Sequence, residues 1–501
     1  MECRIVLTVM SSVVRKILLI LIIGSSVRTL SPAAALQAPS FQQDLQERRQ
    51  RLEQALSPNA MLILWSAPVR VYSGDVNYPY RQDSNIYYFS GIEQPETILV
   101  ILPGNKIRKE YLFIRPRDAV QEHWEGHSLT EDEATAISGI STVYSTLDFE
   151  PFLDSVLSRK SFEREIGVTT SDYDTFFTAL QNSAAQIAVV GPPPGVSGTL
   201  PESYAFVNKL RERFAGLQMR DVSTQTARLR LIKTDYEQRM LEESARISGE
   251  AHREGMKVAK AGVWEYQVQA AMEYIFRKDG AIGWGYPSIV ASGPNATTLH
   301  YEASTRQMKA GELLLVDAAA NYKYLTTDIT RTYPIDGKFS GPQKDIYELV
   351  LRAQDEGIKA AVDGATLRDV HQKTAEVIRQ GLMKLGLITR NDQYSIWYTH
   401  SSSHWIGIDV HDVGDRDARL EDGMAFTIEP GIYIRQDALD ALPKSAENEE
   451  FIQKTKSAFN KYKDIGVRIE DSFVMTNGKA RQISVGIPRT VDEIESFMKS
   501  R

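Results

Sequence analysis

The chain has 501 residues, of which 42% are hydrophobic and 25% are charged, so a disordered or fibrous protein is excluded. This length exceeds what one hydrophobic core usually supports and predicts about two or three domains. The 58 basic and 65 acidic residues give a formal net charge of −7, which argues against nucleic acid as a partner. The single cysteine, Cys3, excludes an intramolecular disulfide and a thiolate-rich metal site.

Residues 1–40 have the order of a secretory signal peptide followed by a short linker. Arg15-Lys16 precedes the apolar run Ile17–Ile23, and small residues follow at Ala33 and Ala35, which together form a cleavage pattern. The apolar run is shorter than the ~20 residues that a membrane span needs, so no stable membrane insertion is predicted. We therefore expect a secreted or periplasmic protein. The alternatives are an uncleaved anchor and a cytoplasmic protein with a misassigned start codon.

Residues 41–215 have the pattern of an α/β domain. Leucines recur at helical spacing within 42–56, which predicts an amphipathic helix. Strands are predicted where short apolar runs are bounded by turn-forming or charged residues, at 61–64, 97–102, 111–114 and 187–190. Strands that alternate with helical stretches favour an α/β fold. A linker is expected at 216–233.

A second domain that mixes strands with helices is predicted over 234–501. Thr234 and Glu237 form a capping-box pattern at the start of a helix that runs to about Lys260. Further strands are expected at 312–319, 322–333, 424–429 and 467–475, and helices at 342–361 and 367–385. Residues 436–464 are polar and strongly charged, which is typical of a surface insertion.

Two aspartates stand out in this second domain. Asp317 ends an apolar run, and Asp328 follows eleven residues later in a segment rich in β-branched residues. An antiparallel pair of strands joined through Asn321 can bring both carboxylates together, although register and bulges decide their faces. Adjacent carboxylates repel and must be neutralised by a proton or a cation. An isolated aspartate at a strand end more often forms a turn or a cap, so the pair alone is weak evidence.

Histidines also stand out in this second domain. His400, His404 and His411 fall within twelve residues, and His300 precedes the first aspartate. Imidazole is the commonest neutral metal ligand and a proton shuttle near neutral pH. A lone histidine in apolar surroundings is more often a satisfied core residue, but three in one short segment favour a functional site. Their spacing is unlike the closed patterns of structural zinc.

Two glutamates complete the set. Glu429 follows an apolar strand and directly precedes a Pro-Gly turn, and Glu470 lies between apolar neighbours two residues from Arg468 on the same strand face. Buried glutamates cost several kcal/mol unless they are paired or coordinate a cation. Four carboxylates and one histidine, all expected on strands, form an oxygen-rich site. Such a site suits two divalent ions such as Mn²⁺, Co²⁺ or Zn²⁺.

In their order and local contexts, five residues resemble the metal ligands of the M24 metallopeptidases, specifically of the aminopeptidase P family: Asp317, Asp328, His404, Glu429 and Glu470. The segment Asp75–Gly91 is similar to that family's N-terminal motif. The resemblance implies an α/β N-terminal domain followed by an α+β pita-bread catalytic domain. Two departures are Ser401, where the family usually has glycine, and the length of 436–464.

The resemblance also implies roles for individual residues. Asp317 would bind the first metal, and Asp328 and Glu470 would bridge both metals. His404 and Glu429 would complete the ligands of the second metal. His300, His400 and His411 would bind substrate and transfer protons. Arg468 would contact the metal ligands without binding a metal itself. Mn²⁺ is the expected metal, with Co²⁺ and Zn²⁺ as alternatives.

The expected activity is the release of the first residue from peptides with proline in second position, by a hydroxide held between two metals. The nearest alternative is a prolidase, which cleaves only Xaa-Pro dipeptides with the same metals. An inactive pita-bread protein that binds peptides is disfavoured, because such proteins lose ligands and all five are present here. The resemblance further suggests a homo-oligomer, either a dimer or a tetramer.

Overall fold

The computed structural model of the chain describes residues 40–162, 164, 170–191 and 199–501. The expected signal peptide and its cleavage pattern lie outside the described residues. None of the helices formed by the described residues is long and apolar enough to cross a membrane. Residues 40–501 belong to one compact unit.

A mixed six-stranded sheet forms the centre of the N-terminal part, in the order β6-β5-β4-β1-β7-β8. Its central pairs, β1 with β4 and β4 with β5, are antiparallel, and the outer pairs are parallel. The strands are β1 (Ala60–Trp65), β4 (Ile98–Ile101), β5 (Glu110–Ile114), β6 (Val143–Ser145), β7 (Ala185–Val189) and β8 (Leu217–Asp221). A small hairpin comprises β2 (Val71–Ser73) and β3 (Val76–Asn77).

Helices accompany this sheet as the sequence predicts. They are α2 (Phe41–Ala55), α3 (Ser84–Ser90), α4 (Ala119–Glu125), α5 (Glu131–Ser138), α6 (Phe149–Ser158), α7 (Asp174–Gln181) and α8 (Glu202–Arg213). The expected linker at 216–233 was wrong at its start, because β8 lies within it and pairs in parallel with β7. This edge strand is half exposed and carries polar residues, so it lacks the continuous apolar signal of its neighbours. Helix α9 (Ser223–Leu231) then leads to the second domain.

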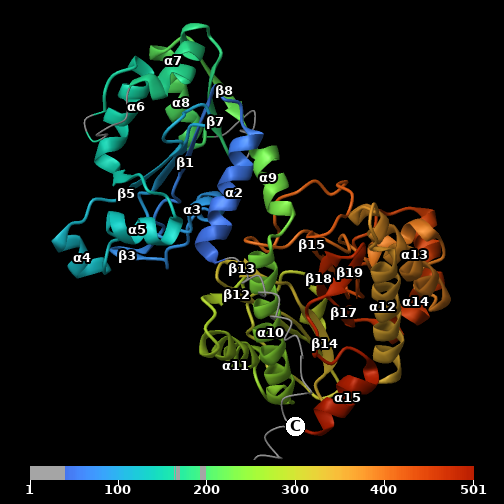
Figure 1. The fold of residues 1–501 in the computed structure, drawn as a ribbon. Helices are drawn as coiled ribbons and strands as arrows, with labels where there is room; N and C mark the ends of the chain where they lie inside the picture. The colour runs from blue at the N-terminus through green and yellow to red at the C-terminus, as the bar shows by residue number, and fades with distance from the viewer. Residues whose placement is uncertain (1–39, 163, 165–169, 192–198) are drawn as a thin grey trace, which may run out of the picture. The chain divides into compact units, whose positions relative to one another are not determined.

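The second domain starts with α10 (Asp235–Val258), which opens with the predicted capping box of Thr234 and Glu237. Helix α11 (Glu265–Lys278) packs beside it. These two helices lie on one side of the strands, and α12 (Gly341–Ala360), α13 (Leu367–Lys384) and α14 (Ala446–Tyr462) lie on the other (Figure 1). The chain ends with α15 (Val491–Lys499).

Several short sheets fill the space between these helices. One has the order β10-β11-β14, from β10 (Ile289–Ser292), β11 (Leu313–Asp317) and β14 (Thr330–Pro334). A second has the order β13-β12-β9, from β9 (Gly283–Trp284), β12 (Ala320–Tyr322) and β13 (Leu325–Thr326). The others are β15-β18-β19 and β16-β17, from β15 (Ala425–Ile428), β16 (Gly431–Tyr433), β17 (Gly466–Arg468), β18 (Asp471–Thr476) and β19 (Lys479–Gln482).

A single backbone bridge brings two of these sheets together at their ends. Thr330, at the start of β14, pairs with Glu470, which lies between β17 and β18. Two long strands expected from the sequence, 322–333 and 467–475, are therefore interrupted where they approach this bridge. At this bridge the strand ends of the two sheets carry polar side chains, and these are surrounded by a core that is otherwise apolar.

Candidate metal centre

Asp317 and Asp328 are brought together by the pairing of β11 with β14. In that register Asp317 lies opposite Thr330, two residues after Asp328. The backbone of Asp328 is also fixed from β18, because Ser472 Oγ accepts a hydrogen bond from its N–H at 2.9 Å and donates to its carbonyl at 2.8 Å. The backbone therefore holds the two carboxylates close despite their repulsion.

The phenol of Tyr286 lies between these two carboxylates. Its hydroxyl oxygen is 2.7 Å from Oδ1 of Asp317 and 2.6 Å from Oδ1 of Asp328. Burial and the neighbouring carboxylates raise the pKa of Tyr286 well above its ordinary value, so the hydroxyl keeps its proton as a donor. The sequence analysis missed this residue, because Tyr286 stands between Gly285 and Pro287 in a turn without periodicity or motif.

Arg468 and Glu470 approach from the end of β17. Arg468 donates from Nη2 to Oδ2 of Asp317 at 2.6 Å and from Nη1 to the hydroxyl of Tyr433 at 2.9 Å. Thr330 Oγ1 accepts from Nε of Arg468 at 3.0 Å and donates to Oε2 of Glu470 at 2.7 Å. The other oxygen of Glu470, Oε1, is buried and has no hydrogen-bond partner among the described residues. A buried carboxylate oxygen of this kind is costly unless a cation or a proton meets it.

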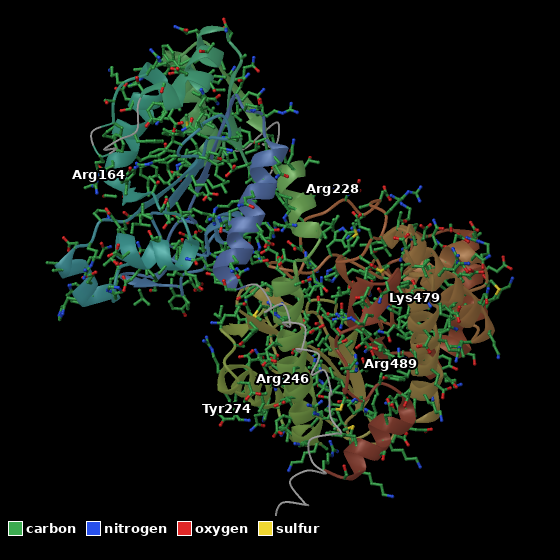
Figure 2. All side chains as sticks on the ribbon, in the orientation of Figure 1. Arg164, Arg228, Arg246, Tyr274, Lys479 and Arg489 are labelled. Atoms are coloured by element: carbon green, nitrogen blue, oxygen red, sulfur yellow. The ribbon has the colours of Figure 1, made fainter. Side chains whose placement is uncertain are left out.

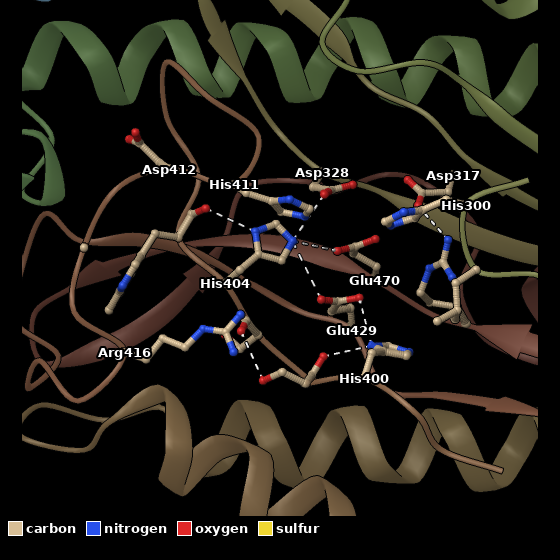
Figure 3. Close-up of a pocket in the computed structure, with 16 residues that line it drawn as sticks. His300, Asp317, Asp328, His400, His404, His411, Asp412, Arg416, Glu429 and Glu470 are labelled. Atoms are coloured by element: carbon tan, nitrogen blue, oxygen red, sulfur yellow. Dashed lines mark hydrogen bonds and ion pairs between the residues drawn. The ribbon is translucent and has the colours of Figure 1, made fainter. Parts of the chain in front are cut away.

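His404 and Glu429 close the cluster from the side of β15 (Figure 3). Nδ1 of His404 lies 3.1 Å from the carbonyl of Trp405, to which it can only donate, so the lone pair is on Nε2. Nε2 faces three carboxylates, at 3.3 Å from Oδ2 of Asp328, 3.7 Å from Oε1 of Glu429 and 3.8 Å from Oε1 of Glu470. The imidazole therefore turns Nε2, the nitrogen left free to bind a metal, toward the acids.

The acids of this cluster lack balancing positive charge. Burial, reinforced by neighbouring carboxylates, raises the pKa of Asp328, Glu429 and Glu470 well above their ordinary values. Burial would also raise the pKa of Asp317, but Arg468 holds it below the ordinary value. One arginine beside four acids leaves a deficit that two divalent cations would fill.

The spacing of the ligand atoms fits such cations. Donor atoms of Asp317, Asp328 and Glu470 lie within 4.8 Å of one another, and so do those of His404, Glu429 and Glu470. Glu470 belongs to both groups, and its orphaned oxygen points to a cation between them. Oxygen ligands with one imidazole suit hard or borderline divalent ions.

A cavity of about 340 Å³ lies over the cluster, and the other predicted histidines line it. Burial lowers the pKa of His400 to about 3, and partial desolvation together with the neighbouring His404 and His300 lowers that of the more exposed His411 to about 4, so both are neutral at physiological pH. Both ring nitrogens of His400 have partners, the carbonyl of Ser401 at 2.8 Å and the hydroxyl of Tyr433 at 2.9 Å. The ring of His411 packs edge-on against His404, with centroids 4.4 Å apart.

All nine site residues expected from the sequence line this one cavity: His300, Asp317, Asp328, His400, His404, His411, Glu429, Arg468 and Glu470. The expectation that the five ligands all lie on strands was wrong. Asp317 closes β11, whereas the other four lie in connections beside strands. Irregular backbone can aim side chains at one point, which a pleat with alternating faces cannot do. Arg416, which also lines the cavity, was not predicted.

Comparisons with known proteins agree with this geometry. Residues 239–477 match the model of metallopeptidase family M24, and residues 45–164 match that of the aminopeptidase P N-terminal domain. The chain is 31% identical to the Xaa-Pro aminopeptidase of Haemophilus influenzae, over 93% of this chain and 99% of that protein.

Two solved structures extend the likeness to the whole fold. Escherichia coli aminopeptidase P with the inhibitor Pro-Leu is 29% identical with a TM-score of 0.77, over 92% of this chain and 99% of that one. Pseudomonas aeruginosa aminopeptidase PepP is 32% identical with a TM-score of 0.76, over 91% of this chain and 97% of that one.

The fold and its cluster of acids define a metallopeptidase of family M24, with a pita-bread catalytic domain behind an α/β N-terminal domain. The predicted fold class is thereby confirmed. Within that class, the chain belongs to the aminopeptidase P family, because it matches both family domains and relatives along nearly their entire length.

Proposed function

We propose that the protein is a Xaa-Pro aminopeptidase, which releases the N-terminal residue from peptides with proline in second position. The observation that carries the proposal is the completeness of the acid cluster, including the buried oxygen of Glu470 that has no hydrogen-bond partner among the described residues. Such a cluster is costly to fold and is explained by metal-dependent hydrolysis, not by passive peptide binding. Relatives that match over nearly their full length are named Xaa-Pro aminopeptidases.

Two divalent cations are proposed for the cluster. Asp317 would hold one, His404 and Glu429 the other, and Asp328 and Glu470 would bridge the two. When bound, such ions lower the pKa of a water and polarise the carbonyl of the scissile bond. Mn²⁺ is our choice for this oxygen-rich set, with Co²⁺ or Zn²⁺ as alternatives.

His300 and His411 are the histidines proposed to meet the substrate. Neither forms a hydrogen bond that competes with substrate among the described residues, whereas His400 is held between Ser401 and Tyr433. Because the pKa of His411 is lowered to about 4, its ring is neutral and can donate one N–H to the developing oxyanion. The nitrogen of a peptidyl proline carries no hydrogen, so it must receive a proton as it leaves.

One feature of the cavity bears on the prolidase alternative. A dipeptidase must hold the free carboxylate after proline, which calls for a positively charged donor. Arg468 is engaged with Asp317 and Tyr433, but Arg416 lines the cavity without an ion pair among the described residues. Arg416 could hold the carboxylate of a dipeptide, so the length of the peptides that are cleaved distinguishes the two activities.

A peptide panel with metal reconstitution tests the proposal. After chelation and reloading with Mn²⁺, Co²⁺ or Zn²⁺, we expect release of the first residue from Xaa-Pro-Yaa tripeptides and longer peptides. Peptides with alanine in place of proline should stay intact. Cleavage of Xaa-Pro dipeptides alone, with tripeptides untouched, would make the protein a prolidase. Absence of stoichiometric metal and of any cleavage would leave a peptide-binding protein.

Export from the cytoplasm is proposed from the leader pattern alone. Cleavage after Ala35 would remove Cys3 and start the mature chain at about residue 36. N-terminal sequencing of natively produced protein tests this, and an intact Met1 on cytosolic protein would refute it.

A homo-oligomer, dimer or tetramer, is proposed from the family resemblance. Light scattering coupled to size-exclusion chromatography gives the mass in solution. A monomer at micromolar concentration would refute the proposal.

A further inference from the structure

The loop that carries His411 has no regular secondary structure, so its anchors decide where the imidazole lies. The loop leaves the metal cluster at Trp405 and closes where the N–H of Asp412 donates to the carbonyl of Trp405 at 2.9 Å. Figure 3 shows His411 beside His404, with Asp412 on the other side of the loop. His411 makes no hydrogen bond to the described residues, so its place is set by the backbone of the loop and by its edge-on contact with His404.

The base of the loop is anchored by buried charges from the end of α9 and from the residues that follow it. Asp412 is buried and forms ion pairs with Arg230 and with Lys233, whose Nζ lies 2.9 Å from Oδ2. Burial alone would raise the pKa of Asp412, but these two cations hold it below the ordinary value. Gly407 is required at this close approach, because a Cβ there would collide with the Asp412 carboxylate and lie 2.8 Å from Nζ of Lys233.

The tip of the loop is held from the first domain. Asp409 Oδ1 accepts a hydrogen bond from Ser84 Oγ at 2.8 Å and a longer one from Arg81 at 3.4 Å. Arg81 also donates to the carbonyl of Ile408 at 2.9 Å. The other oxygen of Asp409 accepts from Arg230 at 2.7 Å. Donors from the first domain and from the end of α9 thus meet on one carboxylate, two residues from His411.

We propose that Asp409 is a positioning residue through which the first domain fixes His411 over the metal cluster. Charge-assisted hydrogen bonds are about twice as strong as neutral ones, so they can hold an irregular loop in one arrangement. Displacement of a catalytic group by about 1 Å can cost on the order of 10²-fold in rate. This inference rests on the proposed role of His411 in peptide hydrolysis.

The hydrogen bonds of Asp409 can be distinguished by experiment from contacts that only join the two domains. The Asp409 side chain is 37% exposed, so it is not needed to fill the core. A purely structural role would lower stability or activity whether or not His411 is present. A positioning role acts through His411 and must vanish once that imidazole is removed.

A double-mutant cycle on the full-length, metal-loaded enzyme separates these readings. Asp409→Ala is expected to lower kcat/KM for an Xaa-Pro-Yaa peptide by roughly 10- to 100-fold, mainly through kcat, with metal content unchanged. In the His411→Ala background, the same substitution should cost less than about 3-fold. Arg81→Ala should reproduce part of the loss, and Arg81→Lys should restore part of it.

Arg228→Ala is the matched control. Arg228 lies on α9 near Arg230, projects from the surface (Figure 2), and pairs with Glu421 at 2.9 Å where both side chains are exposed. Its removal should leave kcat/KM unchanged within about 2-fold. Thermal unfolding of each variant shows whether the fold is intact.

Three outcomes are informative. Full activity in Asp409→Ala, or an equal loss with and without His411, would overturn the positioning role while leaving the peptidase proposal intact. A normal rate in His411→Ala alone would instead overturn the catalytic role proposed for that histidine. A loss of activity in Asp409→Ala that occurs only when His411 is present supports the inference.

Discussion

Asp328 lies close to several other ionisable side chains of the site. It faces Asp317 and the imidazole of His404, and it belongs to two of the three groups of residues whose donor atoms lie within 4.8 Å of one another. Its raised pKa follows from burial and then from the charge of Asp317. These contacts are favourable only when a cation takes the place of the proton.

Asp328→Asn keeps the shape of this side chain and removes its charge. We expect metal occupancy to fall and turnover to drop by ~10²-fold or more. Even the mutation of a residue that only hydrogen-bonds a metal ligand lowers metal affinity or activity by about 10- to 100-fold. Metal analysis of the purified variant and peptide turnover at saturating Mn²⁺ are the measurements. A near-normal rate at saturating metal would show that Asp328 is not a ligand.

Tyr286 is predicted to tune the metal site without binding the metal. Tyr286→Phe removes the hydroxyl that lies within hydrogen-bond distance of both aspartates and leaves the ring in place. Metal affinity should fall by roughly 10-fold, as measured by competition with a chelator. Tyr274→Phe, at an exposed position on α11, is the control and should bind metal normally. Unchanged affinity in Tyr286→Phe would assign that residue to packing alone.

The ligand candidates were visible in the sequence because charged residues interrupt apolar runs, which is costly without a partner. Tyr286 was not visible because tyrosine is acceptable in any half-buried turn, and its partners lie 31 and 42 residues away. The engagement of His400 by Tyr433 was hidden for the same reason. Side-chain partners across a fold are set by three-dimensional pairing, which local patterns do not encode.

Among the elements, buried strands and long helices were the most predictable. The expected strand 61–64 is β1, and the capping box at Thr234 begins α10 as expected. The expected strand 322–333 instead turns at Lys323 and Tyr324, which have positive φ angles of 52° and 66°. The turn places Lys323 between two tyrosines and contains neither the glycine nor the proline that most clearly marks a turn, so its position is not evident from the sequence.

The 436–464 segment shows a second limit of sequence patterns. It is charged enough to suggest a surface insertion, yet α14 within it buries Phe451 and Tyr462 against the core. Tyr462 also donates to Asp345 on α12 at 2.8 Å. Along the chain, α14 connects β16 with β17, the strands that carry Tyr433 and Arg468. It packs on α12, which contacts both strands, so we expect its packing to support them.

Phe451→Ala tests this support. Removal of a phenyl ring that is 97% buried should lower the free energy of unfolding by about 3 kcal/mol. Lys454→Ala on the same helix is the control and should change it by less than about 0.5 kcal/mol. Urea unfolding followed by circular dichroism gives both values. Equal stability of the two variants would mean that α14 is not anchored through Phe451.

Across the whole molecule, buried charges connect the two domains. Arg48 on α2 is buried, pairs with Asp44, donates to the carbonyl of Tyr88 and lies 3.9 Å from Glu237 at the start of α10. The sequence predicted α2 as an amphipathic helix but not that its polar face is covered. Contacts between residues about 190 positions apart leave no trace in a local pattern.

Metal and protons are predicted to compete for the cluster, and this competition couples activity, stability and pH. Asp328, Glu429 and Glu470 have pKa values raised above the ordinary 3.8 and 4.5 in the metal-free fold. Just above those ordinary values the folded chain therefore holds more protons than the unfolded chain. The contribution of these acids to stability is present at low pH and is lost as pH rises through the folded-state pKa values. Asp317, whose pKa is lowered, is already ionised in this window.

Cations that replace these protons should reverse that loss. Binding of Mn²⁺ at neutral pH should release protons, and the difference in Tm between metal-loaded and metal-free protein should widen as pH rises above the ordinary range of these carboxyls. Free metal at about 100 times its Kd adds about 2.7 kcal/mol of stability, which is readily measured. Calorimetry in buffers of different ionisation enthalpy counts the protons, and Glu429→Gln should release fewer. A constant difference in Tm together with no proton release would show that these acids are ionised before metal binds.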